Sequence, residues 1–279
     1  MLACTILCEN TAGRPGIIGE FGFSALIELG KETILFDTGS GKGIIPNCLA
    51  LKKNLGHVKK ILISHGHSDH TEGLPQVLAL TGDVEVHGHP DIFSNHLSVS
   101  KRGEEEIERF IGLPYNREYL EGLGACFVLD KGFQEIIPNV FLTGEIPRIT
   151  DFEPGAPGFA VRKNGERERD PLLDDQALVI RTDKGLIIIF GCGHSGIINT
   201  IQYAQKQTGV ERIRALLGGT HLGPAKEEQL EKTLIRLNEL FPDTVAVSHC
   251  TGMVPALRLM LEFGDSFSFA NAGSVFTFN

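Results

Sequence analysis

A histidine-rich loop that follows a buried strand constrains this chain more than any other feature. An apolar, β-branched run ends in the sequence His-Gly-His-Ser-Asp-His. His65 and His67 are two residues apart, so in extended backbone their side chains point the same way and can bind one ion. Asp69 and His70 follow where the chain is expected to turn into a helix, and they can face a second ion. The glycine between the first two histidines permits a close approach of the backbone.

The alternative interpretation is a solvated polar loop whose histidines cap a helix. Three imidazoles and a carboxylate packed this tightly would repel one another on protonation, and they would resist desolvation unless something bound them. The pattern therefore favours a metal site over a solvated loop.

The composition is that of a soluble globular protein. The chain has 279 residues, of which 42% are hydrophobic and 22% are charged, and this is ordinary for a chain with a substantial core. Its longest apolar runs are strand-sized and too short to span a bilayer. The sequence opens directly into a strand-like run, without the charged and apolar regions of a signal peptide in series. We therefore expect a cytoplasmic protein without a membrane partner.

Net charge bears on the class of partner, and cysteine usage bears on the redox state of the thiols. The formal net charge of −9 argues against a nucleic-acid-binding surface. The six cysteines are scattered through a chain too large to need disulfides, so reduced thiols are expected. The sequence does not fix the oligomeric state, and a dimer is compatible with it.

The first ninety residues predict strands and helices in alternation. Strands are expected at 3–8, 24–29 and 33–36 as a meander, then at the histidine strand and at 84–87, with helices at 44–55 and 74–81. The third strand ends in Asp37, which precedes a threonine and a glycine. Asp37 is a turn residue or a carboxylate that orients a ligating imidazole.

Residues 91–170 differ in composition from the preceding segment, with charge clusters and loops rich in proline and glycine. One helix is expected at 103–112, strands at 125–129 and 140–143, and an exposed hairpin tip within 162–170. We interpret this stretch as a lid or cap region that carries substrate contacts, inserted into a single domain that spans residues 1–279.

The last hundred residues return to core strands that end in polar side chains. Strands are expected at 177–181, 186–190, 214–217, 244–248, 267–269 and 275–278, and helices at 197–207, 226–240 and 254–263. Cys192 and His194, then His221, then His249 follow the ends of three of these strands. Sites in layered α/β proteins assemble at the carboxyl ends of strands, so the repetition predicts a composite site.

These motifs resemble those of the metallo-β-lactamase superfamily. The resemblance rests on Phe36-Asp37-Thr38-Gly39, on His65-x-His67-x-Asp69-His70 and on the late single histidines, and it covers about residues 24–255. It implies an α/β fold, the four-layer αββα sandwich, with metals at the edge between two sheets. Three further motifs, at 143–148, 191–197 and 218–222, resemble a branch of dihydropterin–ribofuranosylaminobenzene 5′-phosphate synthase-like proteins.

The resemblance also implies ligands for two divalent ions. The first ion would take His65, His67 and His194, and the second would take Asp69, His70 and His249. Asp37 matches the aspartate that does not bind metal itself but orients a ligating imidazole through a hydrogen bond. There is one departure, because many members place a bridging aspartate where this chain has Cys192. The bridge could be absent, replaced by the thiolate, or supplied by Asp174 or Asp175.

Three hypotheses for the function follow. The first is a hydrolase in which two ions, Zn²⁺ first with Mn²⁺ or Fe²⁺ as alternatives, generate a hydroxide that attacks a small anionic substrate such as a phosphoester. Asp69 and His221 are its candidate catalytic residues, and His221 could instead be a weaker ligand or a phosphate contact. The second is the activity of the synthase branch, which joins a dihydropterin to an arylamine phosphate through a C–N bond. The third is a non-hydrolytic iron oxidoreductase or sensor, although no appended flavin-binding domain is visible in the sequence.

Overall fold

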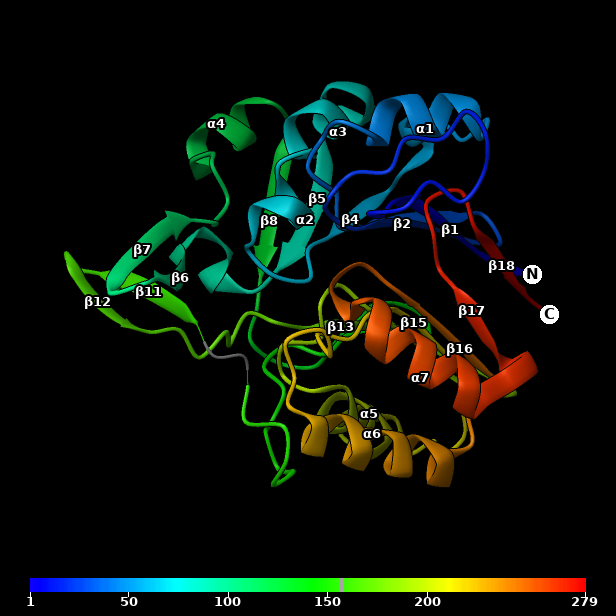
Figure 1. Cartoon of the computed structure of the whole chain (residues 1–279). Coiled ribbons are helices and arrows are strands. Elements are labelled where there is room, and N and C mark those ends of the chain that lie inside the picture. Colours follow the sequence, from blue (N-terminus) through cyan, green and yellow to red (C-terminus); the bar gives the residue numbers. More distant parts are fainter. Residues whose placement is uncertain (156–157) are drawn as a thin grey trace. The chain divides into compact units, whose positions relative to one another are not determined.

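The computed structural model describes residues 1–155 and 158–279 (Figure 1). Two compact units divide the chain. Unit 1 comprises Met1–Leu129, Pro157–Asp174 and Ala272–Asn279, and unit 2 comprises Asp130–Ala156 and Asp175–Asn271. The predicted lid region, 91–170, is shared between the two units. The predicted single domain over the whole chain stays a prediction.

Unit 1 is built on a mixed sheet with helices on one face. In sheet order its strands are β18 (Val275–Phe278), β1 (Leu2–Cys8), β2 (Ser24–Leu29), β3 (Glu32–Phe36), β4 (Lys60–Leu62), β5 (Val84–Gly88) and β8 (Ala125–Leu129). Its helices are α1 (Ile44–Ala50), α2 (Ser68–Thr71), α3 (Leu74–Thr81) and α4 (Arg117–Gly122), with short 3-10 turns at Leu55–His57 and Pro90–Phe93. Apolar side chains of α1 and α3 pack against the sheet, and this burial of apolar surface holds the layers together.

The first predicted helix is shorter than the sequence suggests. It was expected over 44–55, but α1 ends at Ala50 and the chain turns through Lys52, whose φ is 56°. A 3-10 turn then carries Leu55 into the core, where it is buried. Burial of this leucine requires the chain to leave the helix, and tertiary packing overrides the helical pattern.

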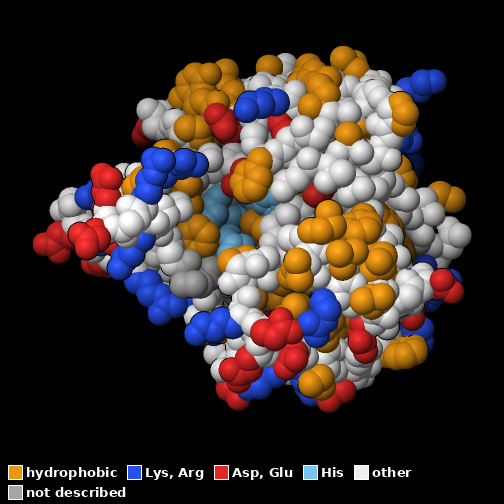
Figure 2. Space-filling model, in the orientation of Figure 1, with side chains coloured by type: hydrophobic (Ala, Val, Ile, Leu, Met, Phe, Trp, Pro, Cys, Tyr) orange, Lys and Arg blue, Asp and Glu red, His pale blue; other side chains and the backbone are white. Residues whose placement is uncertain are grey.

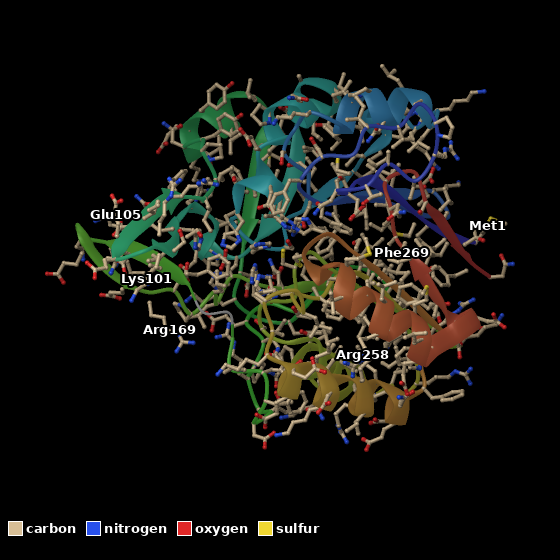
Figure 3. All side chains as sticks on the ribbon, viewed as in Figure 1. Met1, Lys101, Glu105, Arg169, Arg258 and Phe269 are labelled. Atoms are coloured by element: carbon tan, nitrogen blue, oxygen red, sulfur yellow. The ribbon has the colours of Figure 1, made fainter. Side chains whose placement is uncertain are left out.

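The predicted helix at 103–112 is wrong, because this stretch forms part of a small antiparallel sheet in unit 1. The strands, in sheet order, are β12 (Glu166–Arg169), β11 (Phe159–Lys163), β6 (Asn95–Arg102) and β7 (Glu105–Phe110). Lys101, Glu105 and Arg169 mark this sheet in Figure 3, and charges of both signs are mixed over it in Figure 2. Glu108 in β7 pairs with Arg162 and Arg167 of the other hairpin. The backbone of β7 pairs with the preceding strand β6, with Arg102 opposite Glu105, so this stretch is one arm of a hairpin.

Unit 2 has its own mixed sheet and three helices. In sheet order the strands are β17 (Phe267–Phe269), β16 (Thr244–Ser248), β15 (Ile213–Gly219), β14 (Gly185–Phe190), β13 (Ala177–Thr182), β10 (Val140–Leu142) and β9 (Gln134–Ile137). The helices are α5 (Ile197–Thr208), α6 (Glu227–Leu240) and α7 (Met253–Phe263), with 3-10 turns at His249–Thr251 and Gly264–Ser266. The buried stripes of all three helices share one core with the sheet. The outer side of α7 leaves hydrophobic side chains exposed (Figure 2).

Parallel pairing places the site residues at defined sheet edges. In unit 1, β3 and β4 are parallel neighbours, so Asp37 and the histidine loop emerge at the same edge. In unit 2, β14, β15 and β16 are successive parallel neighbours, and their carboxyl ends likewise meet. No cysteine of the described ranges is in a disulfide. None of the helices described is both long and apolar enough to cross a membrane.

Candidate metal centre

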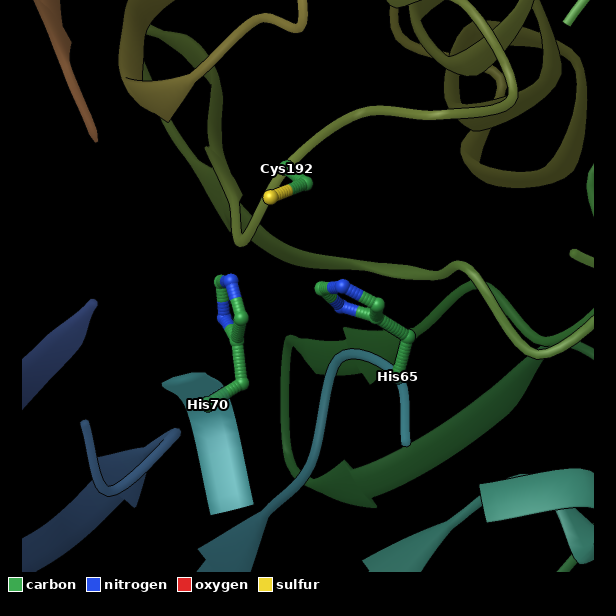
Figure 4. A group of neighbouring side chains, drawn as sticks. All are labelled: His65, His70 and Cys192. Atoms are coloured by element: carbon green, nitrogen blue, oxygen red, sulfur yellow. The ribbon is translucent and has the colours of Figure 1, made fainter. Parts of the chain in front are cut away.

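The loop between β4 and α2 gathers four side chains with metal-ligating atoms in unit 1. The imidazoles of His65, His67 and His70 are buried, and Asp69 is half-buried. The ring centroid of His65 lies 4.5 Å from that of His67 and 4.2 Å from that of His70. Figure 4 shows His65 and His70 side by side. Asp69 Oδ2 lies 3.8 Å from His70 Nε2. Nitrogen and oxygen atoms this close can share a divalent ion with bonds of about 2.0–2.2 Å.

Asp37 fixes the tautomer of His70. The residue follows β3 with a φ of 59° and is fully buried. Its Oδ2 lies 2.7 Å from His70 Nδ1 and accepts a hydrogen bond from Ser64 Oγ at 2.6 Å, while its Oδ1 accepts from the Ser64 amide at 2.7 Å. Because a carboxylate can only accept, Nδ1 of His70 carries the proton and Nε2 presents its lone pair. This is the tautomer that a metal ligand needs.

A buried histidine lies between two carboxylates, one of which also forms a hydrogen bond with the histidine-rich loop. His96 of β6 has its Nδ1 2.6 Å from Asp170 Oδ2, and its Nε2 lies 3.5 Å from Asp174 Oδ2. Asp174 Oδ2 accepts a hydrogen bond of 2.8 Å from the amide of Gly66, between the two leading histidines. A Cβ on Gly66 would lie 2.4 Å from the carbonyl oxygen of Ile92, so the close approach that this glycine permits is to backbone.

Sequence reasoning overlooked His96 and Asp170. Asp170 ends the charged run that was interpreted as an exposed hairpin tip, and His96 stands alone among polar residues. Antiparallel pairing of β6 with β11 brings the two together, with His96 opposite Val161. A contact between strands so far apart in sequence leaves no periodic signal.

Burial and charge move the pKa values of the two neighbouring histidines in opposite directions. Burial lowers the pKa of His67 to about 3, so this side chain is neutral at pH 7, as a metal ligand must be. Burial also acts to lower the pKa of His96, but the hydrogen bond that His96 donates to Asp170 and the charges of Asp174 and Asp170 raise this pKa to about 9. The two rings are 5.5 Å apart between centroids.

The stability of the metal-free protein is therefore expected to peak near pH 6.5. The raised pKa of His96 stabilises the fold fully below about pH 6.5, and this contribution of roughly 3 kcal/mol is lost as pH rises through about 9. The depressed pKa of His67 acts in the opposite sense, since the unfolded chain takes up this proton as pH falls from about 6.5 towards 3. Urea unfolding of the metal-free protein from pH 4 to 9 measures both limbs. His96→Gln is expected to flatten the alkaline limb, and a wild-type stability that rises steadily to pH 9 would contradict the assignment.

In unit 2 the ends of three parallel strands carry the second group of side chains. Cys192 and His194 follow β14, His221 follows β15, and His249 follows β16; Figure 4 shows Cys192 on its loop. The ring centroids of His194 and His221 are 4.2 Å apart. His221 and His249 have φ values of 49° and 51°, a left-handed backbone that is rare outside functional sites and turns.

Further contacts link the predicted residues of unit 2 to neighbouring side chains and loops. Asp175 Oδ2 accepts a hydrogen bond of 2.8 Å from the amide of Ser195, next to His194. One ligating atom each of Cys192, His249 and Cys250 lies within 4.8 Å of the other two. Cys250 was not among the predicted site residues, because it was considered only as part of the motif around His249.

The predicted ligands thus fall into two sets, one in each unit. His65, His67, Asp69 and His70 come together in unit 1, and Cys192 and His249 come together in unit 2, where His194 lies against His221. That the two sets hold the same pair of ions stays a prediction, as does a bridging role for Asp174 or Asp175.

Comparison with known proteins decides the family. The sequence model of the metallo-β-lactamase superfamily matches residues 17–204. The chain belongs to the metallo-β-lactamase superfamily. The resemblance drawn from the histidine motif is thereby confirmed.

Relatives that cover the whole chain refine this placement within the superfamily. The chain is 31% identical to the 7,8-dihydropterin-6-methyl-4-(β-D-ribofuranosyl)-aminobenzene-5′-phosphate synthase of Methanocaldococcus jannaschii, over 98% of this chain and 95% of that one. It shares 30% identity and a TM-score of 0.85 with the crystal structure of Tm1679, a metal-dependent hydrolase of the β-lactamase superfamily, over 100% of both chains. The Zn²⁺-bound PqqB of Methylobacterium extorquens, 11% identical, has the same fold with a TM-score of 0.56 over 99% of this chain and 100% of that one. The predicted αββα fold class is confirmed.

The donor atoms fit the divalent ions that the superfamily implies. The buried imidazoles beside a half-buried carboxylate in unit 1, and the thiols beside an imidazole in unit 2, are suited to Zn²⁺ and its neighbours, and poorly suited to Mg²⁺ or Ca²⁺. The neutral form of His67 and the tautomer of His70 favour coordination. Together with the family, these buried clusters identify a metal-dependent enzyme of the metallo-β-lactamase superfamily.

Proposed function

We propose that this enzyme joins a dihydropterin to an arylamine phosphate, with the metal ions held by histidine, aspartate and cysteine. The observation that carries the proposal is the synthase of M. jannaschii, which is 31% identical over nearly the whole of both chains. A relative that extends over both units supports the same overall chemistry better than a match to one motif.

The predicted ligands would hold two divalent ions. His65, His67 and His194 are assigned to the first ion, and Asp69, His70 and His249 to the second. Zn²⁺ is the ion that we expect first, with Mn²⁺ or Fe²⁺ as alternatives. Ions held in this way supply Lewis acidity that neutralises negative charge on a leaving phosphate or activates water.

The chain's own residues would orient the substrates and move one proton. In the joining reaction the arylamine nitrogen attacks the methyl carbon of a dihydropterin that bears an anionic leaving group. The C–O bond to that group breaks, the C–N bond forms, and the amine gives up a proton. We assign Asp69 or His221 to hold this proton, because both carry a basic atom next to a predicted ligand, His70 and His194 respectively.

A cavity in unit 1 is suited to a planar, anionic substrate. It has a volume of about 540 Å³, and Phe93, Phe110, Tyr115 and Arg117 are among its lining residues. This volume lies within the range of about 300–1,000 Å³ found for small-molecule sites. Aromatic walls favour a planar ring, and a guanidinium favours a phosphate. The Ser68 amide donates a 2.7 Å hydrogen bond to the carbonyl of Ile111, which connects the cavity's segment to the ligand loop.

Hydrolysis of a small phosphoester is the second candidate, and the likeness to Tm1679 favours it. The same donor atoms serve both reactions, since water takes the place of the arylamine as nucleophile. The substrate tested, and not the metal ligands, separates the two functions.

The deciding experiment offers zinc-loaded protein two sets of substrates. One reaction contains a 6-hydroxymethyl-dihydropterin diphosphate and a ribofuranosylaminobenzene 5′-phosphate, and the other contains a generic phosphodiester. A coupled product in the first reaction, detected by mass spectrometry and lost after chelation, is the expected result. Turnover of the phosphodiester alone would support the hydrolase. Full activity after complete chelation would contradict both, and parallel loading with Mn²⁺ and Fe²⁺ tests the choice of ion.

A further inference from the structure

Unit 2 contains a cluster of sulfur and nitrogen atoms that the sequence did not reveal as a set. Cys192 follows β14, whereas His249 and Cys250 follow β16. One ligating atom of each lies within 4.8 Å of the other two, and Cys192 and His249 are buried. The two cysteines are far apart in sequence and come together because β14, β15 and β16 run parallel.

The contacts of Cys250 place its sulfur among the loops after all three strands. The backbone amide of His221 donates a hydrogen bond of 3.3 Å to Cys250 Sγ, and Sγ donates one of 3.3 Å to the carbonyl of Cys192. A Cβ on Gly219 would lie 2.7 Å from this sulfur, so the glycine leaves the space that the sulfur occupies. The amide of His221 would favour a thiolate at Cys250, whereas the carbonyl of Cys192 accepts the proton of the thiol form, which metal binding would displace.

We infer that Cys250 binds metal together with Cys192 and His249, which gives this enzyme a site with two thiolates. The inference depends on the proposed function only in that the protein binds a divalent ion. Zinc–sulfur bonds are about 2.3 Å long, so two sulfurs on one tetrahedral ion are about 3.8 Å apart, which requires little movement from the present arrangement. Each thiol releases its proton when it binds the ion.

The chemical consequence is a preference for thiophilic ions at this position. Two thiolates and an imidazole favour Zn²⁺ or Fe²⁺ over Mn²⁺, which prefers carboxylate and water. Cys192 would then occupy the place where many members of the superfamily carry a bridging carboxylate, and Cys250 would add a second sulfur. The second ion would be bound more tightly than in a carboxylate-bridged site. Because two thiolates carry more negative charge than one shared carboxylate, the net positive charge of the ion with its ligands would also be smaller.

Cobalt substitution tests this assignment through the ligands themselves. Cobalt(II) bound to thiolate absorbs in the near ultraviolet by charge transfer, whereas cobalt bound only to histidine and aspartate does not. We expect wild-type protein loaded with Co²⁺ to show this band, Cys192→Ser and Cys250→Ser each to show about half its intensity, and the double variant to show none. Serine keeps the ability to form the hydrogen bonds of Cys250, so a purely structural cysteine would leave the band unchanged and overturn the inference. Cys126→Ser, at an exposed cysteine of unit 1, is the matched control and should keep the full band.

A second measurement on the unaltered protein needs no variant to fold. Alkylation of each thiol, followed by mass spectrometry with and without Zn²⁺, is expected to slow at least tenfold at Cys250 and Cys192 when zinc is present, while Cys126 reacts at the same rate. Equal rates at Cys250 with and without bound zinc would overturn the inference. The proposed function is judged separately, by product formation in the substrate experiment, and it stands if metal binds without thiolate absorption.

Discussion

Replacing His67 with alanine is expected to lower zinc affinity by about 10²-fold or more and product formation by about three orders of magnitude. The side chain is buried, its pKa is lowered to about 3, and its ring lies 4.5 Å from that of His65. A neutral, preorganised imidazole binds metal without first losing a proton, and alanine removes this donor entirely. Metal content after dialysis against a zinc buffer, together with initial rates, measures both effects.

The control for this variant is a histidine of the same unit with no assigned role. His57→Ala removes an exposed ring whose Nε2 lies 3.3 Å from the amide nitrogen of Asn54, and it should leave metal content and rate within twofold of wild type. Circular dichroism establishes that both variants are folded. A His67→Ala protein with the full complement of zinc and wild-type rates would remove His67 from the site.

Replacing Asp37 with asparagine is expected to weaken binding of the second ion by about 10–100-fold, although no predicted ligand is altered. In one orientation the asparagine amide group faces His70 Nδ1 and Ser64 Oγ. His70 must then accept at Nδ1 and carry its proton on Nε2, which removes the lone pair from the metal side. In the other orientation the amide group faces the Ser64 amide, and two donors oppose each other in a buried place.

Asparagine tolerates the positive φ of Asp37, so the variant changes hydrogen bonding and leaves the backbone conformation in place. Zinc titration of the metal-free protein should show one site unchanged and one weakened. Asp83→Asn, at an exposed aspartate just before β5, is the matched control and should bind both ions as wild type does. Identical titrations for Asp37→Asn and wild type would show that the carboxylate does not support the ligand.

Local spacing was enough to predict much of the site. His65 and His67 at alternate positions, followed by Asp69 and His70, need only the geometry of a strand that turns into a helix to come close together. The ends of β14, β15 and β16 were also predictable, because apolar runs that stop at glycine followed by cysteine or histidine mark strand termini. The fold class and the family followed from the same motifs.

Contacts between distant segments were beyond the reach of the sequence. The predicted helix at 103–112 became β7, one arm of a hairpin with β6, and the other edge of β6 pairs with the distant strand β11. His96 became a brace for the ligand loop only when β11 paired with β6 and the chain beyond it supplied Asp170 and Asp174.

The amino-acid sequence by itself therefore determined which donor groups this protein offers and at which strand ends they lie, since these depend on backbone periodicity over a few residues. The tertiary structure alone decided which carboxylates fix the histidines and which sulfur lies beside Cys192. Those neighbours are set by sheet pairing and burial, whose free energies are summed over many residues far apart in the chain.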